Sequence, residues 1–178
     1  MNEIANLADV LGADVDHIRR GIGADSRIGH SFLYAGCGYG GSCFPKDTQA
    51  LVSTAKSYGQ SLKLVSATEQ VNAQQKRLLV DRLVQRMGDD LSGRKIAIWG
   101  LSFKPNTDDM REATSRVVIQ ELLMRGAQVN AYDPVAGAEA LRALRIDCEA
   151  HPGWLNRFEL ASDDMQVLEG ADALMVLT

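Results

Sequence analysis

Apolar residues recur at helical spacing through the first part of the chain. Ile4, Leu7 and Leu11 share one face of a helix, and Gly12 is placed to end it. Asp14 is typical of an N-cap residue and predicts a short second helix. The first helix begins without a cap of its own. This indicates either a helix that continues from preceding sequence or a chain that simply starts there.

Two more helices are predicted after an irregular, glycine-rich segment over residues 21–42. Pro45 suits a first helical turn, and the apolar face of "KDTQALVSTAKSYG" runs to Gly59. The next segment, "LKLVSATEQVNAQQKRLLVDRLVQRMG", repeats apolar residues every three, four or seven positions and predicts one helix of about seven turns. We expect a helix of that length to connect two domains or to line a dimer interface.

The pattern changes from residue 94 onwards. Short apolar runs ("KIAIWG", "QVNAYDP", "ADALMVLT") alternate with helical patterns ("SRVVIQELLMRGA", "AGAEALRAL", "DDMQVLEG"). Strand and helix in this alternation predict parallel pairing with right-handed crossovers, and therefore an α/β fold with a doubly wound sheet. We expect a helical domain over residues 1–88 and an incomplete Rossmann-like domain over residues 89–178, with both ends of the chain truncated.

Composition narrows the range of functions. The 178 residues include 19 lysines and arginines against 23 acidic residues, without a block of like charge, which argues against a nucleic-acid or membrane-surface partner. No apolar run reaches the ~18 residues that span a bilayer, and the N-terminus does not resemble a signal peptide, so we expect a cytoplasmic protein. The three histidines lie apart from any cysteine or carboxylate at ligand spacing, so no metal site is expected.

The stretch "GYGGSCFPKD", residues 38–47, carries the strongest candidate chemistry. Cys43 lies just before the predicted helix, and both the helix N-terminus and Lys46 favour its thiolate form. Asp47 is four residues further on and lies on the same helix face, where it can hold a water or a proton near the sulfur. The alternative is that Cys43 is a small apolar residue packed behind a glycine turn, because free cysteine is often buried.

The sheet domain invites a comparison with dinucleotide-binding folds. Gly100 follows a strand and Asp133 ends the next one, but the loop reads "GLSFKPN" and does not match the glycine fingerprint GxGxxG. The remaining feature is a crevice at the carboxyl ends of the strands, lined by Lys104, Asn106 and Arg111, which suits a phosphate or a mononucleotide. The alternative is a solvated loop whose charges are neutralised by the carboxylates beside them.

Two long segments, "GADVDHIRRGIGADSRIGHSFLYAGCGYGGSCFPKDTQAL" and "KIAIWGLSFKPNTDDMREATS", together with "YDP", resemble the UDP-glucose/GDP-mannose dehydrogenase family over essentially the whole chain. The resemblance implies two Rossmann-type domains joined by a dimerising helical segment. This chain corresponds to that segment and most of the C-terminal UDP-binding domain, without the N-terminal NAD domain. The implied reaction oxidises C6 of UDP-glucose twice, with NAD, through a thiohemiacetal and a thioester on the cysteine, and yields UDP-glucuronate.

The resemblance also implies roles for individual residues. Cys43 is similar to the nucleophile, Asp47 to the carboxylate that assists proton transfer, and Lys46 and Arg111 to residues that reach the cofactor. Arg27 resembles an arginine that contacts the sugar of the neighbouring subunit in a homodimer. The substrate-binding residues that the resemblance implies are Arg27, Phe32, Leu33, Tyr34, Gly40 and Lys104. The other two cysteines, Cys37 and Cys148, are interpreted as structural.

Some residues of the family pattern fall outside this sequence. A lysine and an asparagine on a helix before "NEIA" and an arginine after Thr178 are absent, so we expect the isolated chain to show no detectable turnover. The motif is nearer the UDP-glucose branch, and GDP-mannose oxidation is the alternative within the same chemistry. A non-catalytic dimerisation or nucleotide-binding module is the alternative from another class.

Overall fold

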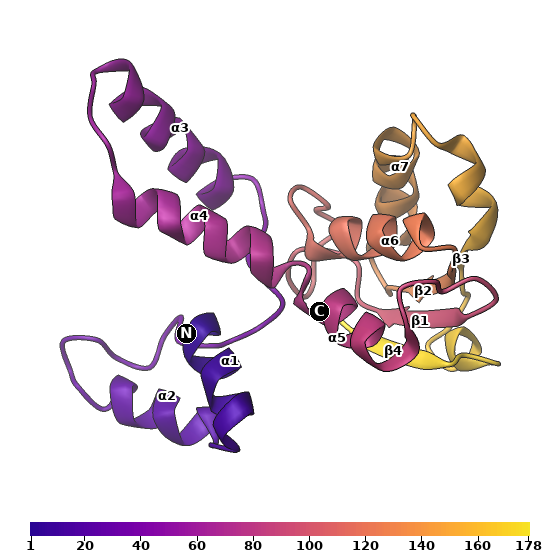
Figure 1. The fold of residues 1–178 in the computed structure, drawn as a ribbon, viewed down its shortest axis with the longest axis horizontal. Coiled ribbons are helices and arrows are strands. Elements are labelled where there is room, and N and C mark those ends of the chain that lie inside the picture. Colours follow the sequence, from indigo (N-terminus) through magenta and orange to yellow (C-terminus); the bar gives the residue numbers. More distant parts are fainter.

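The computed structural model describes residues 1–178 as two parts that meet at a narrow junction (Figure 1). The first part holds four helices and the second holds three helices around a parallel sheet. The helices of the first part are α1 (Asn2–Leu11), α2 (Val15–Gly23), α3 (Phe44–Ser57) and α4 (Lys63–Gln75). No helix is both long and apolar enough to cross a membrane.

Local sequence signals set the ends of the first three helices, as predicted. Gly12 ends α1 in the left-handed conformation, with φ 66°, which a glycine adopts without steric cost. The Asp14 carboxylate caps α2 by accepting hydrogen bonds from the amides of Asp16 and His17. Pro45 lies in the first turn of α3, where its missing N–H leaves no donor unsatisfied.

The predicted long helix over residues 62–88 is wrong, because the structure divides it into α4 and α5 (Leu78–Met87). At the division the Arg77 amide donates to the Gln74 carbonyl at 3.0 Å, a tighter turn than an α-helix makes. The sequence holds no glycine or proline there. The turn lets α5 face the sheet, where Val80 and Leu83 enter its hydrophobic core.

The sheet is parallel with strand order β3-β2-β1-β4, which confirms the predicted α/β class and its Rossmann-like winding. Helices α6 and α7 pack against each other on one side of it (Figure 1). Its elements are β1 (Lys95–Trp99), α6 (Thr114–Met124), β2 (Gln128–Tyr132), α7 (Gly137–Asp147), β3 (Phe158–Leu160) and β4 (Ala173–Val176).

Two elements near the C-terminus differ from the sequence prediction. The helix expected from "DDMQVLEG" is a single 3-10 turn over Gln166–Leu168, which Asp163 caps by accepting from the amides of Met165 and Gln166. Strand β3 was not predicted, because three residues are too few to show an alternating pattern.

The hydrophobic core belongs almost entirely to the sheet part. A cluster of 20 buried residues runs from Val80 to Met175 across α5, the sheet and the helices beside it. Apart from glycines and Pro45, Ala8 is the one buried apolar residue before Val80. The four helices of the first part therefore have almost no core of their own within this chain.

Strand β1 lies between β2 and β4, so the strand order reverses at β1. A reversal of this kind leaves a crevice at the carboxyl ends of the strands. The segment 36–43 is attached at this edge. The Thr114 hydroxyl donates to the Cys37 carbonyl at 3.2 Å, and the Cys37 thiol donates to the Leu177 carbonyl at 3.4 Å. The predicted cysteine motif therefore lies where open α/β sheets bind ligands.

Candidate active site

Of the three cysteines, Cys43 is the one that is exposed. It occupies the N-cap position of α3, and its carbonyl accepts the first helical hydrogen bond from the Asp47 amide at 2.8 Å. Cys37 is half-buried and Cys148 is buried, and burial raises the pKa of each of these two thiols. The interpretation of Cys43 as a packed, buried residue is therefore wrong, whereas the other two cysteines have the surroundings of structural residues.

The glycines before Cys43 allow its loop to pack against the loop that follows β1. A β-carbon on Gly40 would lie 2.3 Å from the Glu112 carbonyl oxygen, and one on Gly41 would lie 2.8 Å from the Phe103 ring. Gly41 also has φ 94°, and its amide donates to the Arg111 carbonyl at 2.8 Å. Gly40 therefore packs on the Glu112 backbone and Gly41 on the Phe103 side chain.

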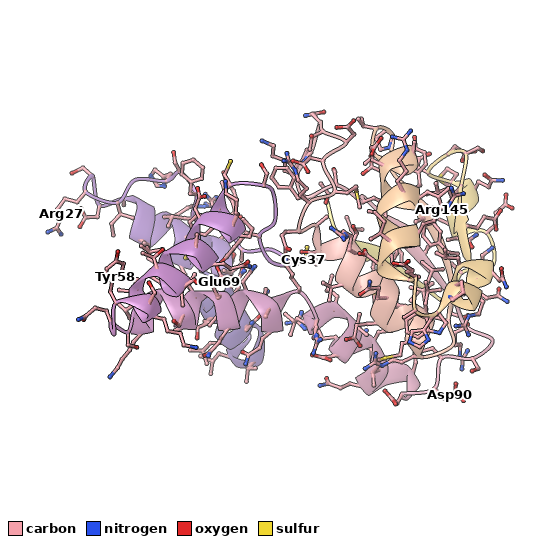
Figure 2. All side chains as sticks on the ribbon, turned by 90° about the horizontal axis from the view of Figure 1, so that it is seen from above. Arg27, Cys37, Tyr58, Glu69, Asp90 and Arg145 are labelled. Atoms are coloured by element: carbon pink, nitrogen blue, oxygen red, sulfur yellow. The ribbon has the colours of Figure 1, made fainter.

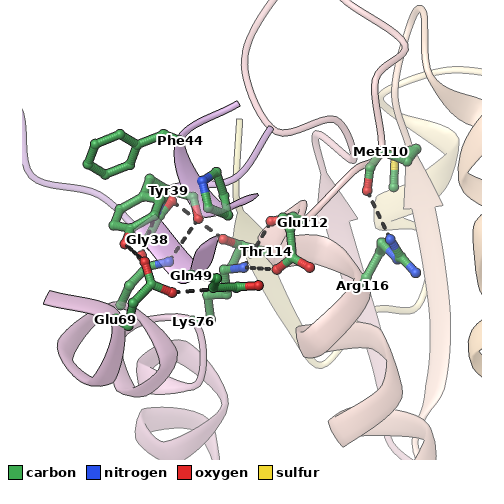
Figure 3. A network of polar contacts seen from close by, with 12 residues as sticks. Gly38, Tyr39, Phe44, Gln49, Glu69, Lys76, Met110, Glu112, Thr114 and Arg116 are labelled. Carbon is green, nitrogen blue, oxygen red and sulfur yellow. Dashed lines mark hydrogen bonds and ion pairs between the residues drawn. The ribbon is translucent and has the colours of Figure 1, made fainter. Parts of the chain in front are cut away.

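Polar side chains of α4 hold the same loop from the other side (Figure 3). The Asn72 amide group both accepts from the Tyr39 N–H at 2.8 Å and donates to the Tyr39 carbonyl at 3.0 Å. The Gln75 side chain donates to the Gly36 carbonyl at 2.7 Å. Because Asn72 and Gln75 are buried, these hydrogen bonds satisfy groups that would be costly to leave unpaired.

Glu69 joins α4 to both the loop and α3 (Figure 3). Its carboxylate accepts from the Tyr39 hydroxyl at 2.8 Å and from the hydroxyl of Thr48. Burial, followed by the hydrogen bond to Glu69, raises the pKa of Tyr39 to about 12. Burial raises the pKa of the Glu69 carboxyl, but hydrogen bonds from Thr48, Tyr39 and Gln49 outweigh it and hold that pKa below its usual value.

Sequence reasoning missed the polar side chains of α4. The signal was present, because Glu69, Asn72 and Lys76 recur at helical spacing and form a polar stripe on a helix that was interpreted only from its apolar residues.

Two cations lie on segments that adjoin Cys43, Lys46 in the first turn of α3 and Arg111 in the loop after β1. Lys46 is exposed and its ammonium pairs with Asp47 at 3.4 Å. The Arg111 guanidinium binds Asp109 through Nε at 2.9 Å and Nη2 at 2.7 Å. The hydrogen bond to Asp109 is the main cause that raises the pKa of Arg111. The structure brings Arg111, which is distant in sequence, to the Cys43 loop, because its carbonyl accepts from the Gly41 amide at 2.8 Å.

The remaining predicted substrate residues fall into three places. Lys104 lies over the Phe103 ring, 5.2 Å from its centroid, beside the Cys43 loop. Phe32, Leu33 and Tyr34 line a hollow of about 440 Å³, whose other lining residues are Met1, Asn2, Ala35, Gly36, Gly38 and Tyr39. Arg27 pairs with Asp25 at 2.5 Å and lies at the far tip of the helical part, well away from Cys37 (Figure 2).

Asp133 has a structural task at the crevice. Its carboxylate accepts hydrogen bonds from the amides of Leu101, Ser102, Val135 and Ala136, and so ties the loop after β1 to the loop after β2. Burial raises the pKa of Asp133, but these hydrogen bonds together outweigh burial and hold the pKa below its usual value. These hydrogen bonds occupy both carboxylate oxygens, so neither is left to bind the ribose of a dinucleotide.

Gly100, at the end of β1, packs closely on the residue that follows Leu177. A β-carbon on Gly100 would lie 2.6 Å from the backbone nitrogen of Thr178. The described side chains include no group of three histidines, cysteines or carboxylates that could hold a metal ion.

Comparison with known proteins identifies the class of molecule. Residues 1–74 match the central domain of the UDP-glucose/GDP-mannose dehydrogenase family, and residues 97–178 match the UDP binding domain of the same family. The chain belongs to the UDP-glucose/GDP-mannose dehydrogenase family. This confirms the resemblance found in the sequence.

Individual relatives agree with this assignment. UDP-glucose 6-dehydrogenase of Pseudomonas aeruginosa is 45% identical over 180 residues, covering 100% of this chain and 38% of that protein. The structure of a UDP-glucose dehydrogenase from Pyrobaculum islandicum superimposes with a TM-score of 0.88 at 36% identity, covering 99% of this chain and 38% of that one. A GDP-mannose dehydrogenase from Pseudomonas aeruginosa gives a TM-score of 0.67 at 26% identity, with 98% and 39% coverage. The chain thus spans well under half the length of these relatives.

Proposed function

We propose that this chain supplies the nucleophile and the nucleotide-sugar site of an NAD-dependent dehydrogenase that oxidises UDP-glucose to UDP-glucuronate. The observation that carries the proposal is the position of Cys43, an exposed thiol at the start of α3, whose loop is hydrogen-bonded to the Arg111 backbone at the carboxyl edge of the sheet. A nearby cation and a helix N-terminus both favour the thiolate, which is the form that attacks carbonyl carbon.

In the proposed reaction the C6 alcohol of the sugar is first oxidised to the aldehyde, and the Cys43 sulfur then adds to this aldehyde and forms a thiohemiacetal. Oxidation of this adduct gives a thioester, and water then cleaves the C–S bond to release the carboxylate and restore the thiol. Asp47 is placed one helical turn after Cys43, exposed to solvent, and can take the proton from that water. The Cys43 sulfur thus forms one C–S bond, and hydrolysis breaks the same bond.

NAD supplies the two hydride acceptors in this chemistry when it is bound. Lys46 and Arg111 are exposed cations beside Cys43 and suit contact with an anionic cofactor. The loop after β1 does not carry the glycine fingerprint of a dinucleotide site, so we assign to Lys46 and Arg111 contact with the cofactor from one side only.

The substrate is proposed to lie between the Cys43 loop and the hollow formed by Phe32, Leu33 and Tyr34. Gly40 and Lys104 adjoin the same loop. The relatives named for UDP-glucose favour UDP-glucose over GDP-mannose. Saturation-transfer NMR on this chain tests the choice, with transfer expected from UDP-glucose and none from GDP-mannose. The reverse result would replace the substrate and keep the chemistry.

We further propose that the helical part forms a homodimer, in which Arg27 of one chain reaches the sugar bound to the other. The support is the missing core: Leu7, Val10 and Leu11 form an exposed apolar face on α1, with Val10 83% exposed. Such a face on a part that lacks its own core requires a partner to cover it.

The reactivity of the thiols tests the nucleophile. We expect iodoacetamide to modify Cys43 at least about ten times faster than buried Cys148 in the folded chain, because alkylation requires an accessible thiolate. Peptide mass spectrometry at timed intervals measures both rates in one sample. Equal rates would remove the physical basis of the catalytic assignment and favour a non-catalytic nucleotide-binding or dimerisation module.

A further inference from the structure

Lys76 is the one charged residue among the buried residues of the chain, and it lies at the division between α4 and α5. Its side chain is 8% exposed. A buried ammonium requires close hydrogen-bond partners. Both partners of Lys76 belong to Glu112, because Nζ donates to the carbonyl oxygen and to the carboxylate Oε2 of that residue, each at 3.0 Å (Figure 3). The cation therefore connects the helical part to the loop after β1.

Glu112 is held in an unusual conformation at this contact. Its φ of 54° falls in the left-handed region, which residues with a side chain rarely adopt. The carbonyl oxygen that accepts from Lys76 is the same atom against which Gly40 packs, and the neighbouring Arg111 carbonyl accepts from the Gly41 amide. Lys76 thus acts on the one short stretch of backbone that supports the Cys43 loop.

The same stretch of backbone carries Arg111, the cation that the proposed function assigns to the Cys43 site. Arg111 precedes Glu112 directly, and Gly41 lies two residues before Cys43. We propose that Lys76 is a positioning residue of the Cys43 site: by holding Glu112, it fixes the Gly40–Gly41 contact and, through it, the separation between Cys43 and Arg111. This inference rests on the proposed function, because it assigns Lys76 a part in the chemistry of that thiol.

Arg125 provides a matched control. Its side chain is 19% exposed and pairs with Glu121 and Asp89, but it lies at the end of α6, away from the Cys43 loop. Lys76→Met and Arg125→Met each remove a largely buried cation from its acidic partners. A general loss of packing would affect both variants, whereas positioning of the Cys43 loop concerns Lys76 alone.

Amide hydrogen exchange on the 178-residue chain tests the position of the loop directly. Because the Gly41 amide is bonded to the Arg111 carbonyl, we expect the peptide covering residues 38–43 to exchange at least about ten times faster in Lys76→Met and at the parent rate in Arg125→Met. Unchanged protection in Lys76→Met would overturn the proposal, and so would an equal loss in Arg125→Met.

A double-mutant cycle separates positioning from a merely structural role. In the parent chain we expect Arg111→Gln to slow alkylation of Cys43 by about 3- to 10-fold, because a neighbouring cation is lost. In the Lys76→Met background the same change should slow it by less than about 2-fold, because the two groups are no longer held together. Equal effects of Arg111→Gln in both backgrounds would overturn the proposal.

A second variant covers the case in which Lys76→Met does not fold. Glu112→Gln keeps the carbonyl contact and removes the charge that pairs with Lys76, so we expect exchange over residues 38–43 to accelerate by a smaller factor, and unchanged exchange would contradict the proposal. Failure of the proposed function is visible separately, in the ratio of the Cys43 and Cys148 alkylation rates of the parent chain. The exchange measurement does not depend on that ratio.

Discussion

Gly40 has no room for even one more carbon atom. A β-carbon there would lie 2.3 Å from the oxygen and 2.8 Å from the carbon of the Glu112 carbonyl, and backbone atoms cannot move aside as a side chain can. We expect Gly40→Ala to lower the free energy of unfolding by about 1–3 kcal/mol, the usual cost of overpacking. Urea unfolding followed by circular dichroism measures the change.

Gly36 is the matched control for that substitution. A β-carbon on Gly36 meets no atom within 4 Å, so we expect Gly36→Ala to change the free energy of unfolding by less than about 0.5 kcal/mol. If the two alanine variants unfold at the same urea concentration, the close packing of Gly40 on Glu112 does not contribute to stability.

Asp133 makes stability depend on pH. The hydrogen bonds from backbone amides hold the pKa of its carboxyl below the usual value, so the folded state favours the ionised form. The unfolded chain binds this proton near pH 3.9. The contribution of Asp133 to stability is therefore fully present above about pH 4 and is lost as the pH falls through the lower pKa of the folded state.

The variant Asp133→Asn tests this dependence. At pH 7 we expect it to be about 1–2 kcal/mol less stable than the parent chain, because it loses acceptors for buried amides, and we expect the difference to shrink below about pH 4. Asp108→Asn serves as the control, because Asp108 is exposed and accepts no hydrogen bond within the chain. A constant difference between parent and Asp133→Asn from pH 7 to pH 3 would show that ionisation of Asp133 has no part in stability.

Among the elements, α4 has the clearest conflict between propensity and packing. Alanine is a better helix former than asparagine, yet Asn72 makes two hydrogen bonds to the Tyr39 backbone. We expect Asn72→Ala to lower the free energy of unfolding by about 1–3 kcal/mol, because buried backbone groups of Tyr39 lose their partner.

Gln74 lies on the exposed side of the same helix and its side chain makes no hydrogen bond within the chain. Gln74→Ala should leave stability unchanged or raise it by a few tenths of a kcal/mol, as helix propensity alone requires. Both variants can be compared in one series of urea titrations. A stabilising Asn72→Ala would mean that the bond to Tyr39 contributes nothing.

The elements also show which features the sequence makes predictable. Gly12, Asp14 and Pro45 act on their own helix ends, so their effect is local and was predicted correctly. No local signal marks the division between α4 and α5, where Lys76 binds Glu112, a residue far along the chain. A contact between residues far apart in sequence cannot be inferred from the pattern of either segment.

The candidate site divides in the same way. Cys43 at a helix start with Asp47 one turn later follows from neighbouring residues, and the structure places both at the start of α3. The approach of Arg111 to the Cys43 loop depends on the fold of the sheet part, which brings the loop after β1 to the glycine segment. The sequence proposed Arg111 for a crevice, and the resemblance implied contact with the cofactor, but neither predicted the bond between its backbone and the glycine segment.

At the scale of the whole molecule, the two parts differ in how they are stabilised. The sheet part buries a continuous core from Val80 to Met175. The helical part relies on the polar contacts of α4 and leaves the apolar face of α1 uncovered in a single chain. A part with so little buried apolar surface has a weak driving force for folding alone, so association should contribute to its stability.

The proposed dimer can therefore be tested through α1. We expect the parent chain to sediment at twice its mass of 19.4 kDa, and the double variant Leu7→Glu/Leu11→Glu to sediment at that mass, because two charges per chain would have to be buried in the interface. The control places the same two charges on exposed apolar residues of the sheet part, Val135→Glu/Ile146→Glu, and should remain dimeric. A monomeric parent chain at micromolar concentration would contradict the dimer. A control variant that dissociates as readily as the α1 variant would place the interface elsewhere than on this face.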